Sequence, residues 1–321
     1  METQEQKDLI KNAIEQAKLN GILKYLPNGE LTHAPFSLRP YAMPESVFEK
    51  MAELTVPFNE LMIKVSRNTD FLIHHLEPIA AIDPFLKMLL KCRSKEINQN
   101  CQLLIQRNDF FIANVKHNDY KQNTTPTNEI TEESVLRQVE LNTVSASFPF
   151  LITRLYQLHK NLFEQNKLPK VIQNNPLDAV VDAFAHSVQN YGISDSVILV
   201  VVQSNEKNIF DQIGLQQHLW IKHNIATVRK TLVEIHKDGK LRQGHLVVDG
   251  KTVALTYFRA GYTPDDFPEE QAFKGRQLIE ASSTIQVPDM GMQLSGMKKI
   301  QQVLTKKEVL ADFVTEEISR R

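Results

Sequence analysis

The sequence predicts an α/β fold with a doubly wound parallel sheet in its second half. The run from Val197 to Val202, Val-Ile-Leu-Val-Val-Val, is apolar throughout and rich in β-branched residues. Such a run is typical of a strand that is buried on both faces of a parallel sheet. A polar loop follows it directly, and helical periodicity begins at about Ile209. We therefore expect an α/β subdomain over residues 195–296.

The first 194 residues predict a mixture of helices and strands. A strand is expected over residues 102–112, and a polar stretch over residues 120–133 predicts a loop that returns the chain to the next strand. Periodicity and proline positions indicate the helices. These helices cover residues 3–20, 150–165 and 176–190, and two more begin at Pro44 and Pro84.

The remaining elements of the second half follow from local patterns. Asp249-Gly250 separates two apolar runs, which is the pattern of a β-hairpin with a two-residue turn. Further segments are read from periodicity: a strand near residues 227–235, a helix over 271–283 and an amphipathic helix over 306–319.

Polar side chains alternate with apolar ones just before residue 143. Val139 and Leu141 are expected on the buried face of a strand, so Glu140 and Asn142 project from the opposite face, about 7 Å apart. A carboxylate and an amide carbonyl are hard oxygen ligands that suit Mg²⁺. An ordinary polar strand face that meets water explains the same spacing, and spacing alone favours that interpretation. This strand is expected to pair antiparallel with the preceding one, which would bring Arg107 near Glu140.

Composition excludes several classes of protein. The net charge is −1 and the pI is about 6.8, so neither nucleic acid nor an anionic membrane surface is an expected partner. Two cysteines without metal-ligand spacing argue against a disulfide framework or a zinc site. The polar N-terminus does not resemble a signal peptide, so the expected location is cytoplasmic.

Six segments, taken together, resemble eukaryotic-type glutathione synthetase of the ATP-grasp superfamily. Among them, residues 138–148 read Gln-Val-Glu-Leu-Asn-Thr-Val-Ser-Ala-Ser-Phe, and residues 293–302 read Gln-Leu-Ser-Gly-Met-Lys-Lys-Ile-Gln-Gln. The other four lie at residues 34–40, 107–110, 206–212 and 257–262. The resemblance extends from Ala34 to about Gln302.

The resemblance implies ATP-dependent ligation of γ-glutamylcysteine to glycine through an acyl phosphate, giving glutathione. Mg²⁺ and ATP are then expected at the site, with Glu140 and Asn142 as metal ligands, and Glu140 and Lys298 next to the nucleotide. Arg107 is the implied catalytic residue, because it would hold the reacting carboxylate. The implied substrate-binding residues are Arg107, Ser145, Ala146, Ser147, Glu206, Asn208, Gln212, Arg259 and Tyr262.

Two positions depart from the family pattern. Ala260 stands where an aspartate is usual, so Arg259 is expected to be held less rigidly. Pro149-Phe150 replaces the common Gly-Gly pair, so a stiffer loop is expected after the serines.

The implied organisation is the N-terminal part of an ATP-grasp fold. Residues 1–194 form an α+β part with the Mg²⁺/ATP-site strand, residues 195–296 form the α/β substrate-binding subdomain, and residues 297–321 start the return to the ATP-grasp domain. The chain is expected to end before that domain is complete. A homodimer, or association with a C-terminal portion, is also suggested.

Activity of the chain alone is not expected. The 11 glycines include no glycine-rich run that could cover phosphates, and there is no Walker pattern. The alternative is a non-catalytic protein of the same origin that binds γ-glutamylcysteine or glutathione. An oxidoreductase is a weaker alternative, because no GxGxxG follows any expected strand.

Overall fold

A computed structural model describes residues 3–93, 101–113, 135–165 and 171–315. The chain is a mixed α/β protein that divides into two compact units. Each unit is made of several separate segments of the chain. The parts expected from the sequence, residues 1–194, 195–296 and 297–321, are each continuous, and this division stays a prediction. The expected loop at residues 120–133 lies outside the described residues. Unit 1 comprises residues 1–40, 98–103 and 147–286, and unit 2 comprises residues 41–97, 104–146 and 287–321.

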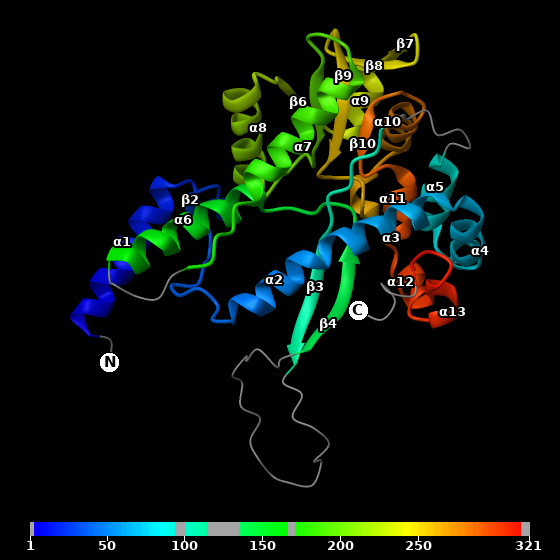
Figure 1. Cartoon of the computed structure of the whole chain (residues 1–321). Helices are drawn as coiled ribbons and strands as arrows, with labels where there is room; N and C mark the ends of the chain where they lie inside the picture. The colour runs from blue at the N-terminus through cyan, green and yellow to red at the C-terminus, as the bar shows by residue number, and fades with distance from the viewer. Residues whose placement is uncertain (1–2, 94–100, 114–134, 166–170, 316–321) are drawn as a thin grey trace. The chain divides into compact units, whose positions relative to one another are not determined.

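Unit 1 contains the main sheet and the helices around it (Figure 1). Its helices are α1 (Gln4–Leu19), α6 (Pro149–Gln165), α7 (Pro176–Tyr191), α8 (Ile209–His223), α9 (Leu232–Asp238), the 3₁₀ helix η1 (Pro264–Asp266) and α10 (Glu270–Glu280). Its strands are β1 (Leu23–Tyr25), β2 (Leu31–His33), β5 (Val197–Val201), β6 (Thr227–Lys230), β7 (Lys240–Arg242), β8 (His245–Val248), β9 (Lys251–Phe258) and the first two residues of β10 (Ile285–Val287).

Strand β5 lies in the interior of the main sheet, as the sequence predicts. The strand order is β6-β5-β9-β8-β7, and β10 also pairs with β9. β5 runs parallel to both of its neighbours, and all five of its residues are buried. β8 is antiparallel to β9 and to β7, so the sheet is mixed and not parallel throughout. The predicted Asp249-Gly250 turn is present, and both residues have positive φ, as a two-residue hairpin turn requires.

Helices cover both faces of this sheet (Figure 1). Val197, Leu199 and Val201 pack with residues of α9 and α10 in one apolar cluster. On the other face, the rings of Phe184 in α7 and Tyr257 in β9 lie 5.1 Å apart. Because alternate residues of a strand point to opposite faces, the continuous apolar run of β5 is explained by burial on both sides.

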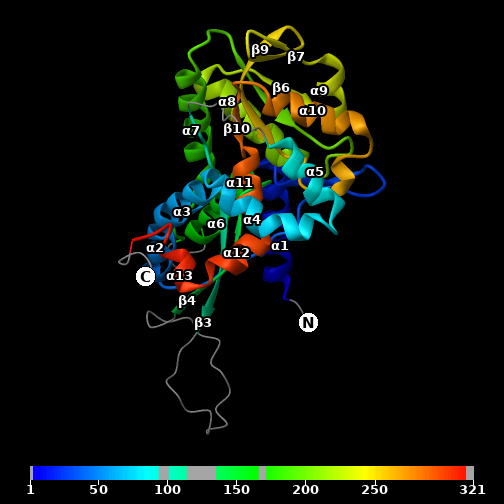
Figure 2. The ribbon, with the colours of Figure 1, turned by 90° about the vertical axis from the view of Figure 1, so that its right-hand side faces the viewer.

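Unit 2 is a group of helices around a two-stranded antiparallel sheet. Figure 2 shows α4 and α12 side by side, in agreement with their contacts. The helices are α2 (Glu45–Glu53), α3 (Thr55–Arg67), α4 (Thr69–Ala80), α5 (Pro84–Cys92), α11 (Met290–Ser295), α12 (Lys298–Leu304) and α13 (Lys307–Leu310), and the strands are β3 (Arg107–Ala113) and β4 (Val135–Asn142).

A β-bulge in the β3–β4 pair changes the expected faces of β4. Asp109 lies opposite Glu140, but the next residue of β3, Phe110, lies opposite Gln138, so Val139 has no partner across the pair. A bulge leaves its extra residue unpaired and disturbs the alternation. The prediction of Val139 on the buried face is therefore wrong: 47% of its surface is exposed, whereas Leu141 is buried as expected.

Three expected elements have other bounds. The strand predicted over residues 102–112 begins only at Arg107, because its partner β4 ends at Asn142, directly opposite. The strand expected over 227–235 ends at Lys230, and Thr231 and Glu234 form a capping box that begins α9. The amphipathic helix predicted over 306–319 is limited to α13 within the described residues, which end at Thr315.

Candidate functional site

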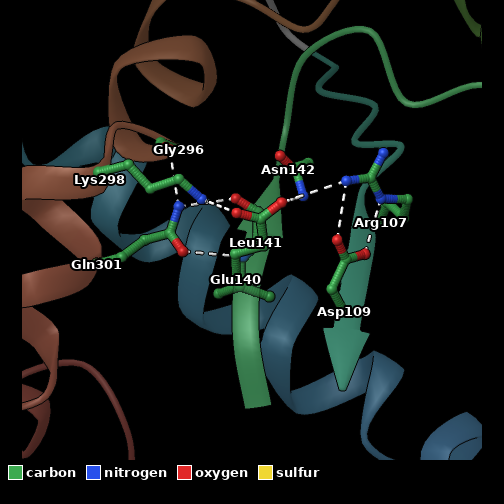
Figure 3. Close-up of polar contacts among 8 residues, drawn as sticks. All are labelled: Arg107, Asp109, Glu140, Leu141, Asn142, Gly296, Lys298 and Gln301. Carbon is green, nitrogen blue, oxygen red and sulfur yellow. Dashed lines mark hydrogen bonds and ion pairs between the residues drawn. The ribbon is translucent and has the colours of Figure 1, made fainter. Parts of the chain in front are cut away.

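A group of charged residues gathers at the end of the β3–β4 pair in unit 2 (Figure 3). The register places Arg107 opposite Asn142 and Asp109 opposite Glu140. Lys298, the first residue of α12, reaches the same carboxylate. These five residues are called the Glu140 cluster below.

Each oxygen of the Glu140 carboxylate has partners in this cluster. Oε1 accepts hydrogen bonds from Asn142 Nδ2 at 2.9 Å and from Arg107 Nη2 at 3.3 Å. Oε2 pairs with the ammonium of Lys298. Arg107 also donates to both oxygens of Asp109, at 2.7 and 2.9 Å. This two-point geometry fixes the plane of the guanidinium group, so Arg107 is oriented by Asp109 and is directed towards Glu140.

The charges of the cluster keep its ionisable groups charged. The Lys298 ammonium, and then the Asn142 amide, lower the pKa of Glu140 to about 2. The hydrogen bonds donated to Asp109 raise the pKa of Arg107 above its usual value. Glu140 is therefore an anion at neutral pH, flanked by two cations.

The helix that carries Lys298 is attached to β4 by a second set of contacts. The side-chain amide of Gln301 hydrogen-bonds the backbone N–H and C=O of Leu141, at 2.9 and 2.8 Å, and also donates to the carbonyl oxygen of Gly296 at 2.8 Å (Figure 3). One residue after the strand, Thr143 Oγ1 donates to the Met292 carbonyl oxygen at 2.7 Å. These bonds hold β4 and the α11–α12 segment in register.

The donor set of the cluster fits a hard divalent cation. Glu140 supplies a carboxylate, Asn142 supplies an amide carbonyl, and the ammonium of Lys298 already shows that a cation is stable beside Glu140. Within the described ranges, no three His, Cys, Asp or Glu side chains gather closely enough to hold a metal ion by themselves. Mg²⁺ does not need such a group, because it usually keeps several waters and shares phosphate oxygens.

A second group of predicted residues lies in unit 1, after strand β5. Glu206 Oε1 accepts a hydrogen bond from the backbone N–H of Asn208 at 2.8 Å, which folds the loop onto the start of α8. Gln212, one turn into α8, is only 2% exposed. Both polar atoms of its side chain, and Oε2 of Glu206, are buried without a hydrogen-bond partner in the part of the chain that the structure describes. Buried amides are normally satisfied, so an unsatisfied one requires an explanation such as a ligand.

Arg259 and Tyr262 follow strand β9, the parallel neighbour of β5. The Arg259 side chain is buried, and its guanidinium group lies 5.8 Å from the Tyr257 ring centre. Burial raises the pKa of Tyr257, and the charge of Arg259 opposes this effect. Asp266 accepts hydrogen bonds from the backbone N–H groups of residues 261–263 and so fixes the loop that carries Tyr262.

The structure shows what packs around the two departures from the family pattern, Ala260 and Pro149-Phe150. Ala260 belongs to the apolar core formed with α9 and α10. Phe150 packs so closely on Gly214 of α8 that a Cβ on that glycine would lie 2.2 Å from the ring. Pro149 is the first residue of α6, so the segment after the serines is a helix N-terminus.

The serine segment spans the boundary between the two units. Ser145 has φ of +53°, a left-handed conformation that is uncommon outside glycine. Ala146 is buried, and Ser145 and Ser147 are half-buried. Asp211 lies near this segment within unit 1, where its carboxylate accepts hydrogen bonds from the N–H groups of Phe148, Phe150 and Leu151 at 2.9–3.2 Å.

The family follows from a comparison with known proteins. Residues 3–320 match the family model described as "Eukaryotic glutathione synthase, ATP binding domain". The chain belongs to the eukaryotic glutathione synthase family. This result confirms the resemblance that the sequence motifs indicate.

Individual members of the eukaryotic glutathione synthase family match only part of their length. The chloroplastic glutathione synthetase of Solanum lycopersicum is 37% identical over 303 residues, covering 90% of this chain and 52% of the relative. The glutathione synthetase of Dictyostelium discoideum is 34% identical over 320 residues, covering 95% of this chain and 63% of the relative. The chain therefore spans between about half and two thirds of the length of these relatives.

A solved structure supports the fold. The apo form of a glutathione synthetase-like effector from Globodera pallida matches with a TM-score of 0.79 at 19% sequence identity. The match covers 100% of this chain and 70% of that one. No helix within the described ranges has both the length and the apolar character needed to cross a bilayer.

The sequence patterns did not identify three residues that hold the candidate site in place, which are Gln301, Asp211 and Asp266. Gln301 lies in a segment that the motif comparison already covers, but nothing local indicates that its amide reaches β4. Asp211 lies within the motif segment 206–212, but its position in the first turn of α8 suggests only a favourable helix charge. Asp266 has a detectable signal, because Thr263-Pro264-Asp265-Asp266 has the spacing of a capping box.

Proposed function

We propose that this chain serves the ATP-dependent ligation of γ-glutamylcysteine to glycine, as part of a glutathione synthetase. In this proposal unit 2 supplies the magnesium and nucleotide site of an ATP-grasp fold, and unit 1 supplies the subsite for the dipeptide. The observation that carries the proposal is the Glu140 cluster. In it, Glu140 pairs with Lys298, which lies 158 residues further along the chain. Both residues lie within the region that matches the family model.

The Glu140 cluster has the charges that phosphoryl transfer requires. Glu140 and Asn142 would hold Mg²⁺, which neutralises phosphate charge when it is bound. Lys298 would contact the nucleotide phosphates, and Arg107, oriented by Asp109, would hold the carboxylate that attacks. Such catalysis consists mostly of positioning and charge neutralisation. The preset guanidinium plane of Arg107 supports its role as the positioning cation.

The dipeptide subsite is proposed at the loops after β5 and β9. Gln212 and Glu206 have buried polar atoms that a peptide ligand with several donors and acceptors would satisfy. Arg259 adds a buried positive charge. Within unit 1, the proposed contacts to the dipeptide are made by Ser147, Glu206, Asn208, Gln212, Arg259 and Tyr262.

A second candidate function is binding of γ-glutamylcysteine or glutathione without catalysis. The unsatisfied amide of Gln212 is compatible with both functions, because it concerns the peptide only. The Glu140 cluster favours the synthetase, because a peptide-binding protein has no use for Glu140 and Asn142 beside a lysine. Nucleotide binding therefore discriminates between the two.

The test is a pair of NMR titrations of the isotope-labelled 321-residue chain, one with Mg²⁺-ADP and one with γ-glutamylcysteine. We expect Glu140→Gln to weaken only the nucleotide, and Arg259→Ala to weaken only the dipeptide. Glu308→Gln and Arg242→Ala remove the same charges from exposed positions and serve as controls. Dipeptide binding without any nucleotide binding would support the second candidate, and the absence of both would contradict the proposal.

Ligase activity is a separate measurement. The 11 glycines form no run that could cover phosphates, so we expect this chain by itself to show no steady ADP release with γ-glutamylcysteine and glycine. Steady release that depends on both substrates would contradict this expectation. The cytoplasmic location, the homodimer and a C-terminal partner stay predictions.

A further inference from the structure

A metal ion at the carboxylate of Glu140 would meet a positively charged group that already pairs with each of its two oxygens. Oε1 is engaged by Asn142 and Arg107, and Oε2 by Lys298. A divalent cation needs a direct carboxylate oxygen, and it repels a neighbouring ammonium or guanidinium group. Binding of the cation therefore includes the departure of at least one positive group from Glu140.

Lys298 is the group that can leave most easily. Its side chain is 68% exposed, so the ammonium can move into solvent without disturbing the core. Arg107 is held by two hydrogen bonds to Asp109, and its contact with Glu140 is longer, at 3.3 Å. The four-carbon stem of Lys298 is flexible, whereas the guanidinium group of Arg107 is fixed in its plane by Asp109.

The backbone that carries Lys298 does not need to move for this exchange. Gln301, on the same helix, hydrogen-bonds both backbone groups of Leu141 and keeps α12 next to β4. The ammonium can therefore swing between Glu140 and another anion while the helix remains in place.

We propose that Lys298 competes with the divalent cation for Glu140: its ammonium pairs with the carboxylate in the free chain and must be withdrawn before the cation binds. This inference rests on the metal site of the proposed function. It gives Lys298 a second role besides contact with a nucleotide, because a phosphate group that attracts the ammonium also frees Glu140 for the cation. Metal and phosphate then favour each other's binding through the position of one side chain.

The test measures Mn²⁺ binding to the full 321-residue chain by electron paramagnetic resonance, without nucleotide. Lys298→Met removes the competitor and should tighten Mn²⁺ binding about two- to fivefold, the range expected for one exposed ion pair. Lys299→Met removes the same charge one residue further along, where the ammonium contacts Gln302 and not Glu140. It should therefore change the affinity less than twofold. Lys298→Arg restores a positive charge and should return the affinity towards that of the wild type.

The outcomes separate this inference from the metal site itself. Glu140→Gln should abolish the Mn²⁺ binding that the other variants show. If Glu140→Gln loses the ion but Lys298→Met and Lys299→Met bind it as the wild type does, the competition is refuted and the metal site stands. Weaker binding by Lys298→Met also refutes the competition. Unchanged binding by Glu140→Gln, or no binding by any variant, refutes both. Thermal unfolding of each variant confirms that it is folded.

Discussion

Gln301 binds the backbone of Leu141 at two points, with Nε2 donating to the carbonyl oxygen at 2.8 Å and Oε1 accepting from the N–H at 2.9 Å. A side-chain amide thus pairs with β4 in the way that a neighbouring strand would. The residue before Leu141 is Glu140, and the residue three positions before Gln301 is Lys298. This pairing sets the register between the carboxylate and the lysine of the Glu140 cluster.

Removal of the Gln301 amide should destabilise unit 2. Gln301→Ala leaves the N–H and C=O of Leu141, a residue that is 4% exposed, without these partners. We expect a loss of about 1–3 kcal/mol in the free energy of unfolding. Gln302→Ala is the matched control, because Gln302 is exposed and its side chain hydrogen-bonds only Lys299 in the described residues. Its effect should stay below about 0.5 kcal/mol in urea unfolding. Equal effects of the two substitutions would contradict this role of Gln301.

Gly296 is required by the close approach of Thr143. A Cβ at position 296 would lie 2.2 Å from Thr143 Oγ1, the hydroxyl that donates to Met292. Gly296→Ala should therefore destabilise the chain by about 1–3 kcal/mol through overpacking.

A double-mutant cycle identifies the cause of that loss. Thr143→Ala removes the clashing atom, so the loss caused by Gly296→Ala should be smaller in the Thr143→Ala background than in the wild type. Strictly additive losses in thermal or urea unfolding would mean that Thr143 is not the obstacle.

Strand β5 and its surroundings could be predicted because the relevant signals are local. A strand that is buried on both faces is apolar at every position, and Val197–Val201 is such a run. The β-hairpin at Asp249-Gly250 is equally local, since residues with positive φ must stand at its turn. The antiparallel pairing of β3 and β4, with Arg107 near Glu140, was also predicted and is confirmed.

Other features depend on distant parts of the chain. The bulge that exposes Val139 arises from the pairing of β4 with β3, and the sequence of β4 alone is compatible with regular alternation. Similarly, the meeting of Lys298 and Glu140 depends on how α12 lies on β4, through Gln301. The missed start of α9 is a different case, because Thr231 and Glu234 have capping-box spacing and could have been recognised.

Asp211 should give the stability of the chain a measurable pH dependence. Burial raises the pKa of its carboxyl group, although three backbone N–H groups and Arg259 oppose the shift. Between the unfolded value of about 4 and the raised folded value, the folded state holds a proton that the unfolded state has released. The contribution of Asp211 to the free energy of unfolding therefore falls as pH rises through that window.

Asp211→Asn should remove this contribution to the pH dependence. The variant keeps one side-chain oxygen for the N–H groups of Phe150 and Leu151, which share Oδ1 in the wild type. Its NH2 group replaces the oxygen that accepts from Phe148, and it cannot ionise. Asp265→Asn, at an exposed position, is the control and should leave the pH dependence unchanged. Urea unfolding between about pH 4 and pH 8 measures the slopes. A wild-type slope that persists in Asp211→Asn would assign the effect to another group.

Gln212 should show opposite effects on stability and on binding. Its side chain is 2% exposed, and neither polar atom has a hydrogen-bond partner in the described residues. An unsatisfied buried amide destabilises the fold, so Gln212→Leu should raise the free energy of unfolding by about 1 kcal/mol or more. If the amide instead binds the dipeptide, the same substitution should weaken γ-glutamylcysteine about 5- to 30-fold, the effect of losing one or two hydrogen bonds.

Gln217→Leu provides the control for that experiment. It makes the same chemical change on the exposed face of α8, so it should alter neither stability nor peptide affinity appreciably. Unfolding in urea and NMR titration with the dipeptide measure the two quantities on the same samples. A purely structural glutamine would lose stability on substitution and leave affinity unchanged, whereas a ligand-binding glutamine would gain stability and lose affinity. Because the two outcomes differ in the sign of the stability change and in whether the peptide affinity falls, this single substitution decides whether the buried amide after β5 is kept for a ligand.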